Sequence, residues 1–477
     1  MGILTGDPAS PILWTIYISD FALTPHPDDI VLGGRRIAHL ELADDIALLC
    51  LSPVGTQLKL HEVEDYCASS FLTVNTGKTV ASVHGPLPAE LPALTLYGAR
   101  LRYEATVAYV GTSFTSSATD IFRSHYDAKA EAAQRTARAL FCLESYIGPL
   151  PPQLALRLYH SHVDPHLIAG CEIVLDARPG ALLALESIQK RYLRRALHVS
   201  PRSPITPLYT ESGVWPLRYR RIELALRFLL YALRDGPPLV QAALEESWSL
   251  AARHSSSSWW SDLHHAAAAL PAPLSIPVHS RPTPEDVTTW IALVPQLVLQ
   301  DLGSAILASE RLDLVQMRLR WDGRNGRRLA LRHACSARNY LALPHQRQRT
   351  AMARLFCSEH PLAVELLRRG SDPLPREDRA CRWCRARSGL PRTLPVEDAV
   401  HVLLECDHPS LTAPRDLLLE LLERIRPNVR RTLFHLPRHQ MLPYLLEEDT
   451  TLTYVASFVA DVWDLCESSD PTGMADA

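Results

Sequence analysis

The hydrophobic pattern of this chain changes character near residue 116. Before that point, short apolar runs separated by turn residues predict strands and hairpins, with one helix expected over Leu58–Ser69. The inward positions expected in this helix are Leu58, Val63, Tyr66 and Cys67. After it, the apolar positions take a helical period. The clearest case lies within Pro216–Leu233, where the periodic positions are Ile222, Ala225, Leu226, Leu229, Leu230 and Leu233. The pattern therefore predicts an α+β fold in which a strand-rich region precedes helical ones.

Composition shifts divide the chain into four consecutive regions, 1–115, 116–235, 236–310 and 311–477. Residues 236–310 combine a serine run, an alanine run and a proline-rich stretch, which predicts a linker or irregular connector. The most apolar stretch, Trp290–Ala308, contains Gln296, Gln300 and Asp301. We therefore expect a buried or amphipathic helix there and no membrane span.

Charge and cysteine usage narrow the class of protein. The 477 residues carry a formal net charge of −3, and this balance excludes a uniformly basic nucleic-acid-binding coat. The ten cysteines are scattered and do not show the regular spacing of a disulfide framework, and nothing at the N-terminus resembles a secretory signal. Both observations indicate an intracellular protein, in the nucleus or cytoplasm. Only 4 of the 49 basic residues are lysine. The arginine excess fits either phosphate binding or a GC-rich coding sequence.

Two adjacent carboxylates, Asp44 and Asp45, interrupt an apolar stretch. The flanks, His39–Ala43 and Ile46–Cys50, predict two short buried strands with the carboxylates at the tip of a hairpin. Burial of two neighbouring carboxylates costs several kcal/mol unless a cation neutralises them, and a divalent metal is the usual solution. A plain turn is the alternative, because aspartate is common in turns.

Four motifs in order resemble the palm of reverse transcriptases from non-LTR (LINE-type) retrotransposons, the fungal ones in particular. They are Gly6-Asp7-Pro8-Ala9-Ser10-Pro11, Leu42-Ala43-Asp44-Asp45, Asn75-Thr76-Gly77-Lys78-Thr79 and Tyr109-Val110-Gly111. The resemblance implies a polymerase palm over 1–115, a helical thumb over 116–235 and a mostly helical C-terminal region. Its implied activity is RNA-directed DNA polymerisation, a nucleotidyl transfer, with an RNA template and a DNA target or primer as partners.

The resemblance also implies roles for individual residues. Asp44 would bind catalytic Mg²⁺ with Asp45 as the supporting carboxylate, and Lys78 would stabilise charge on the triphosphate. The substrate-binding positions would be Gly6, Asp7, Pro8, Ser10 and Asn75. Read without the family, the first box is an ordinary capped helix, mostly buried beyond its start, and Lys78 a solvated side chain. Thr5 and Leu42 depart from the glutamine and the aromatic residue that many relatives carry.

A palm of this family needs a further aspartate on a strand that precedes the Gly-Asp-Pro box. Because the box starts at Gly6, we expect a 5′-truncated relic that is inactive as this polypeptide alone. A misassigned gene start with a complete polymerase upstream is the alternative.

Two arginine-rich stretches are candidate nucleic-acid contacts. In the predicted thumb, Arg194 and Arg195 would grip phosphates, with a solvated helix face as the alternative. The segment 311–354 contains 11 arginines against two aspartates, a local balance of 11 − 2 = +9. Together with Trp321 and Tyr340 this composition suits RNA or single-stranded DNA. The residues assigned to this binding are Arg318, Arg320, Arg324, Arg327 and Arg328.

The spacing Cys381-x2-Cys384-x16-His401-x4-Cys406 predicts a metal site. Four ligands of this kind fit tetrahedral Zn²⁺ with no open position, hence a structural site. Chance spacing is the alternative reading, and His408 is a less well-spaced ligand. The surrounding sequence resembles the zinc knuckle in the C-terminal region of fungal LINE proteins, and in that family the knuckle is thought to bind template RNA or target DNA. The second hypothesis for the whole chain is therefore a non-catalytic, zinc-dependent RNA- or DNA-binding protein of undetermined oligomeric state.

Overall fold

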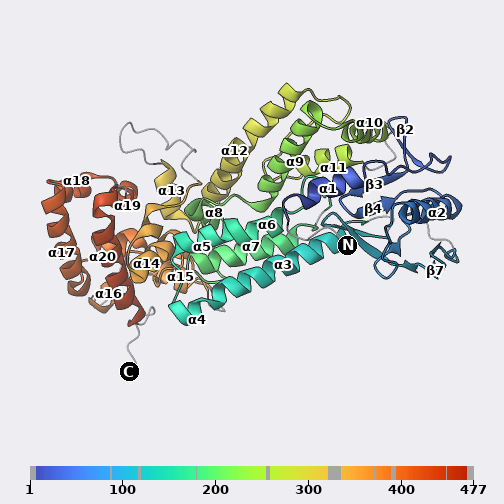
Figure 1. The fold of residues 1–477 in the computed structure, drawn as a ribbon. Helices are drawn as coiled ribbons and strands as arrows, with labels where there is room; N and C mark the ends of the chain where they lie inside the picture. Colours follow the sequence, from blue (N-terminus) through green and yellow to red (C-terminus); the bar gives the residue numbers. More distant parts are fainter. Residues whose placement is uncertain are drawn as a thin grey trace. The chain divides into compact units, whose positions relative to one another are not determined.

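The computed structural model describes residues 7–85, 89–116, 120–178, 180–253, 258–320, 335–369, 372–387, 394–446 and 448–469, with the side chains of 318–320 left out (Figure 1). These residues form a mixed α+β fold that is mostly helical, with small two-stranded sheets. The mixed class predicted from the sequence is thus confirmed.

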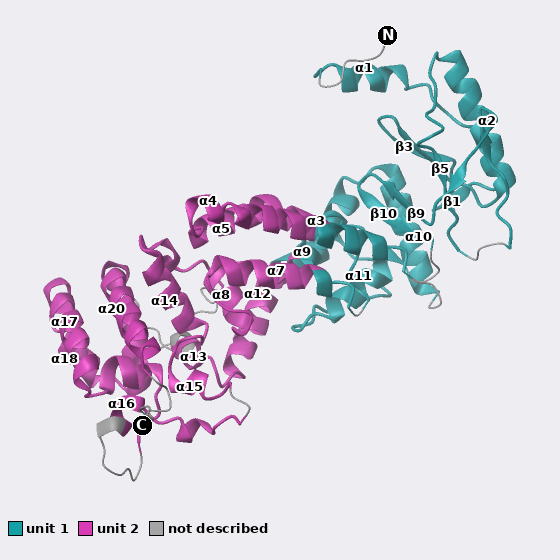
Figure 2. Cartoon of the chain, turned by 90° about the horizontal axis from the view of Figure 1, so that it is seen from below, with its two compact units in different colours: residues 1–131, 168–184, 221–292 teal, residues 132–167, 185–220, 293–477 magenta. Residues whose placement is uncertain are grey.

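Contacts group the chain into two units rather than four consecutive segments (Figure 2). Unit 1 combines residues 1–131, 168–184 and 221–292, and unit 2 combines residues 132–167, 185–220 and 293–477. Each unit is therefore built from stretches that lie far apart in the sequence.

Unit 1 contains the predicted strands as short pairs. The antiparallel pairs are β1 (Ile30–Leu32) with β2 (Arg35–Ile37), β3 (His39–Leu42) with β4 (Asp45–Leu48), β6 (Thr95–Leu96) with β7 (Ala99–Arg100), and β9 (Thr106–Tyr109) with β10 (Thr112–Thr115). β5 (Val80–Ala81) pairs in parallel with β8 (Arg102–Tyr103). The helices among these strands are α1 (Ser10–Tyr17) and α2 (Pro53–Ser69).

Helix α2 organises the core of this region. Ser52 caps the helix by accepting a hydrogen bond from Gly55 N–H at 3.1 Å, and Pro53 occupies the first turn. Its buried Val63 and Cys67 join one apolar cluster and its buried Leu60 joins a second. Leu48 of β4 packs against both clusters, so α2 holds the β3–β4 hairpin in place.

A buried ion pair adds a polar tie between α2 and the turn before β1. Lys59 Nζ lies 2.8 Å from Asp29 Oδ1, and the two side chains are 1 % and 0 % exposed. Burial opposes ionisation of Asp29, but the Lys59 ammonium and the hydrogen bond from His26 N–H outweigh it and lower the pKa of that carboxyl. Loss of one partner would leave an uncompensated buried charge.

Outside the proline-rich residues 269–283, which form no helix or strand, the described residues of 236–310 are mostly helical, so the expectation of an irregular connector is wrong for them. They contain α10 (Pro238–Ala252), α11 (Trp259–Ala268) and α12 (Pro284–Leu307). Ser258 and Ser261 form a capping box at the start of α11, and Trp260 is fully buried. The alanines in this region have high helix propensity, and the buried tryptophan contributes to the core. The serine and proline residues led to the wrong expectation, because they are typical of linkers.

Among the described helices, α12 alone is long and apolar enough to cross a membrane by length and composition. Of its most apolar window, 28 % is buried. One such helix is weak evidence for a membrane span, because core helices pass the same test.

The other helices of the described chain lie mainly in unit 2. They are α3 (Arg123–Cys142), α4 (Glu144–Ile147), α5 (Pro152–Leu158), η1 (Tyr159–Val163), α6 (Asp164–Ile168), α7 (Leu183–Ala196), α8 (Thr206–Ser212), α9 (Leu217–Arg234), α13 (Asp313–Arg320), η3 (Asn339–Ala342), α14 (Gln346–Phe356), α15 (Ala363–Leu366), η4 (Arg376–Asp378), α16 (Arg382–Arg387), η5 (His401–Glu405), α17 (Pro409–Ile425), α18 (Val429–His435), α19 (Arg438–Leu446) and α20 (Asp449–Glu467).

The last helix, α20, is the centre of the C-terminal part of unit 2. It packs against α14, α17 and α19 (Figure 1). Trp463 is 2 % exposed, and its indole N–H donates to Ala351 O of α14 at 3.2 Å. The elements that carry the predicted metal ligands lie around this helical core.

Candidate metal centre

Short elements bring the four predicted zinc ligands together. Cys381 directly follows the β-bridge between Ala380 and Val396, and its N–H donates to Pro395 O at 2.8 Å. Helix α16 begins at the next residue, so Cys384 lies in its first turn. His401 and Cys406 lie at the two ends of η5, where Cys406 N–H donates to His401 O at 2.7 Å.

The distances between ligand atoms fit one tetrahedral zinc ion. Cys406 Sγ lies 3.9 Å from Cys381 Sγ and 3.7 Å from Cys384 Sγ, and Cys384 Sγ lies 3.4 Å from His401 Nε2. Ordinary Zn–S and Zn–N bond lengths imply tetrahedral edges of about 3.8 Å and about 3.5 Å. All four ligand atoms lie within 4.8 Å of one another. The sulfur separations are far from those of a disulfide.

Hydrogen bonds prepare the sulfurs for a cation. Cys384 N–H donates to Cys381 Sγ, and His408 N–H donates to Cys406 Sγ. The hydrogen bond from the Cys381 thiol, against an opposing effect of burial, lowers the pKa of Cys406. Burial and then the charge of Cys406 raise the pKa of Cys384. A bound cation would replace the thiol protons of this cluster.

Two carboxylates and one arginine hold the histidine end of the cluster. Asp398 Oδ1 accepts from His401 N–H at 2.9 Å, and Glu405 Oε2 lies 3.8 Å from His401 Nδ1. Arg438 donates to both carboxylates, at 2.6 Å to Asp398 and 2.9 Å to Glu405. Asp398 thus fixes the backbone at His401, and Glu405 places a carboxylate on the Nδ1 side of the ring, beyond hydrogen-bond distance.

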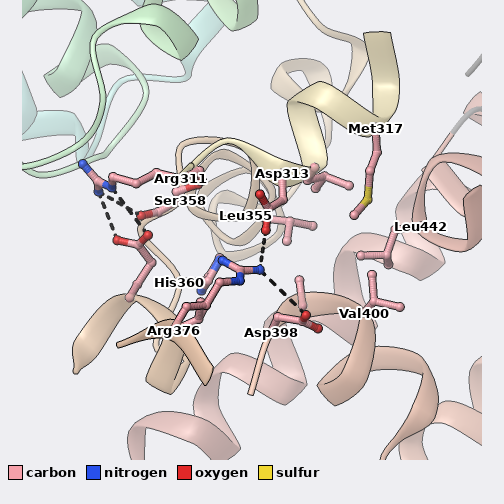
Figure 3. A pocket seen from close by; sticks show the side chains of 14 residues that line it. Arg311, Asp313, Met317, Leu355, Ser358, His360, Arg376, Asp398, Val400 and Leu442 are labelled. Carbon is pink, nitrogen blue, oxygen red and sulfur yellow. Dashed lines mark hydrogen bonds and ion pairs between the residues drawn. The ribbon is translucent and has the colours of Figure 1, made fainter. Parts of the chain in front are cut away.

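Asp398 also borders a small cavity of about 40 Å³. There Arg376 lies between Asp313 and Asp398 (Figure 3). A cavity of this size holds about one water molecule, so it is part of the packing around the cluster and has no room for a substrate.

Arg382 lies between Cys381 and Cys384, and its guanidinium is engaged by partners within the protein. It is 2 % exposed, and its guanidinium pairs with Glu397 Oε1 at 2.6 Å. The remaining N–H groups donate to the carbonyls of Pro361, Cys466 and Ser469. The segment that contains Cys381 and Cys384 is therefore anchored to the end of α20, and the buried Arg382 is not exposed to bind a ligand.

These residues, which support the metal ligands, were not predicted from the sequence. Asp398 and Glu405 lie three residues before and four after His401, and this helical spacing is a signal that could have identified them. Arg382, Glu397 and Arg438 gave no comparable signal, because their partners come from distant parts of the chain.

The predicted aspartate hairpin forms, but its tip is exposed. Leu42 pairs with Asp45 across β3 and β4, and Ala43 takes a left-handed backbone with φ of 54°. Asp44 and Asp45 are both exposed, so the prediction of buried carboxylates is wrong. Water solvates them, and they create no demand for a cation. In the described part of the chain, no third His, Cys, Asp or Glu side chain joins them in a metal-sized cluster.

The Tyr109-Val110-Gly111 motif forms the turn between β9 and β10. Burial and then the charges of Asp45 and Glu41 raise the pKa of Tyr109. The structure therefore places this hairpin in the electrostatic range of the aspartate hairpin.

The Gly-Asp-Pro box begins helix α1. Asp7 Oδ1 accepts from Ala9 N–H at 2.8 Å in the turn before the helix, but no side chain caps α1 itself. Pro8 is exposed, and Ser10 is the first helical residue rather than the N-cap. Gly6 lies outside the described residues. No residue of α1 is buried, so the expectation of a mostly buried helix is wrong. The adjacent apolar cluster covers only part of the apolar surface of α1, and Ile16 is 66 % exposed.

Asn75 and Lys78 form a local turn. Asn75 Oδ1 accepts from Lys78 N–H at 3.2 Å, and its carbonyl accepts from Thr79 N–H at 3.1 Å. The side chain of Lys78 is exposed. This geometry matches a turn-forming asparagine, and it leaves the ammonium group in solvent.

The predicted thumb arginines have partners within unit 2. Arg194 donates to Ser203 Oγ at 3.3 Å and to its carbonyl, whereas Arg195 pairs with Glu144 at 2.7 Å and lies over the Phe141 ring. In the basic segment, the side chains of Arg318 and Arg320 and all of Arg324, Arg327 and Arg328 lie outside the described residues.

No protein-family model and no curated protein matches this chain.

Proposed function

We propose that this chain belongs to the reverse transcriptase lineage of non-LTR retrotransposons and acts by binding nucleic acid through a zinc-organised C-terminal region. The observation that carries the proposal is the Cys381, Cys384, His401 and Cys406 cluster, whose ligand atoms lie within 4.8 Å of one another. The order of the four palm-like motifs in unit 1 supports the lineage. The β3–β4 hairpin with Asp44 near its tip agrees with that order.

Zinc would act structurally in this proposal. Four protein ligands leave no position open for a substrate or for an activated water. The ion would instead fix α16 and η5, and through Arg382 and Arg438 it would fix the helices that these arginines contact. Nucleic acid would then be bound by arginines at the surface, with an affinity that falls steeply as salt increases.

The test compares zinc content with binding. A Cys384→Ser chain should lose bound zinc and weaken binding to RNA or DNA at least tenfold, about 1.4 kcal/mol. Cys142→Ser is the matched control, because Cys142 is an exposed free cysteine outside the cluster. Binding that survives zinc removal unchanged would contradict the proposal.

Metal-dependent polymerisation is the second candidate, and the observation that favours it is the Asp44–Asp45 hairpin near Tyr109. We expect no primer extension by this polypeptide alone. A two-metal site needs carboxylates that converge, whereas these two are solvated and lack a third ligand among the described residues. Mg²⁺-dependent extension of an RNA-templated DNA primer, abolished by Asp44→Asn, would overturn this expectation.

A further inference from the structure

The end of α17 and the following helix α18 carry an unbalanced positive charge. Residues 424–439 contain five arginines and no aspartate or glutamate, in a chain whose net charge is −3. This segment lies wholly inside the described residues, unlike the basic segment singled out from the sequence. Arginine surfaces that run against the average charge of a protein are candidate phosphate contacts.

Most acidic groups near this segment are already engaged. Glu423 accepts from Asn428 N–H and from Arg430 N–H, both at 2.8 Å, and so caps the start of α18. Asp416 pairs with the Arg430 guanidinium. The carboxylates of Glu423 and Asp416 are therefore committed to the helix start and to one flanking arginine.

Arg426 is also committed, because it pairs with Glu448 at 3.1 Å and lies 4.1 Å over the Tyr444 ring. Arg424 and Arg431 are exposed and make no ion pair with any described residue. They are the two charges of this surface that remain for a partner.

An aromatic side chain lies on the same helix face as Arg431. Val429 and Leu433 are buried and define the inner face of α18. Arg431 lies three residues before Phe434 and four before His435, so these three share the outer face. Phe434 is 49 % exposed, and His435 Nδ1 donates to Arg431 O at 2.7 Å. An exposed ring next to the Arg431 guanidinium, which has no ion pair among the described residues, suits stacking of a nucleobase beside its phosphate.

The surface is anchored to the metal centre. Arg438, three residues beyond α18, donates to Asp398, which fixes the backbone at His401, and to Glu405, which lies on the Nδ1 side of the ring. Loading of zinc would therefore fix the corner between α18 and α19.

We propose that Arg424, Arg431, Phe434 and His435 form a binding surface for single-stranded nucleic acid. The inference rests on the proposed function and names its contact residues. Arg424 and Arg431 bind phosphates, and the Phe434 ring stacks on an unpaired base. A duplex hides its base faces, so the surface prefers single strands.

The experiment measures binding of fluorescein-labelled oligouridine and oligodeoxythymidine to the zinc-loaded full chain, with a duplex and polyglutamate as competitors. Phe434→Ala should weaken binding by about tenfold, and Phe434→Trp should restore it. Arg424→Ala with Arg431→Ala should lower the slope of log affinity against log salt by about one to two. Arg347→Ala is the matched control, because Arg347 is an arginine of unit 2 paired with Asp461 and Asp464.

The outcomes separate this inference from the proposed function. Wild-type affinity in the Phe434 and double-arginine variants, with binding lost in Cys384→Ser, would overturn the surface and leave the proposed function standing. Competition by polyglutamate as strong as by oligouridine would overturn the surface in favour of an acidic protein partner. No binding of any oligonucleotide by the zinc-loaded wild type would overturn both.

Discussion

Cys384 is the least buried cysteine of the metal cluster, and its substitution tests the cluster with little effect on packing. Cys384→Ser should reduce bound zinc from about one per chain to near zero and lower the melting temperature by about 5–10 °C. The reason is that three remaining ligands bind the ion much less tightly, and the metal's binding energy contributes to folding. Zinc analysis and thermal unfolding measure both effects. An unchanged zinc content would contradict the assignment of this ligand.

His360 makes the stability of unit 2 depend on pH. It is 6 % exposed, its Nδ1 lacks a hydrogen-bond partner among the described residues, and burial lowers its pKa to about 4. When the pH falls below the ordinary histidine pKa of about 6.5, His360 binds a proton in the unfolded chain but stays neutral in the folded chain. The contribution to stability is therefore complete above about pH 6.5 and is lost as the pH falls towards about 4.

His360→Phe should remove this part of the pH dependence, since it keeps a ring beside Trp463 without a titrating group. The expected difference between wild type and variant is up to about 1.4 kcal/mol per pH unit in that window. Urea unfolding at several pH values measures it. Parallel pH profiles for the two chains would contradict the assignment.

At the residue scale, local spacing predicted what lies close in sequence. The four candidate metal ligands could be predicted because Cys-x2-Cys and His-x4-Cys each place two ligands on one short element. Burial of Asp44 and Asp45 was wrongly predicted, because the apolar flanks do not reveal how much of the hairpin tip its neighbours cover. The partners of Arg382 could not be predicted, since they lie up to 87 residues away.

At the scale of elements, Arg382 joins the knuckle to α20 with a buried ion pair and three carbonyl contacts. Arg382→Met should lower the unfolding free energy by about 3–5 kcal/mol, because it leaves the Glu397 carboxylate buried without its partner. Chemical unfolding of the zinc-loaded chain measures the loss.

Arg347→Met is the control for this prediction. Arg347 also contacts α20, through Asp461 and Asp464, but its side chain is 49 % exposed. A solvated pair of this kind contributes about 0–1 kcal/mol. Equal destabilisation by the two substitutions would show that burial of the Arg382 pair does not determine its contribution.

Helix α2 shows how far an apolar pattern determines an element. Its existence was predicted, with Val63 and Cys67 on the inner face. Leu58, also expected inside, is 46 % exposed, and Lys59 takes a buried position next to Leu60. A buried lysine contradicts any hydrophobic pattern, and only its partner Asp29 explains it. The same limit applies to α10 and α11, which form helices that contact each other, with Trp260 of α11 fully buried.

At the scale of the molecule, the sequence suggested consecutive regions, whereas contacts define two interleaved units. Long helices such as α3, α9 and α12 pass from one unit into the other, and no composition shift marks such a crossing. The helical character of residues 116–235 was predictable from periodicity, whereas that of α10 and α11 was not. Which distant segments meet depends on surface complementarity that periodicity does not contain.

This division predicts that zinc removal acts on one unit. All four ligands and the residues that support them belong to unit 2, between 361 and 469. Unit 1 has its own apolar clusters and its own buried Lys59–Asp29 pair. Chelation should therefore increase hydrogen exchange in α16, η5, α19 and the end of α20 by at least tenfold, about 1.4 kcal/mol of local opening free energy. Exchange in α2 should stay unchanged. Equal deprotection of α2 would mean that the two units unfold together and that the metal stabilises the whole chain.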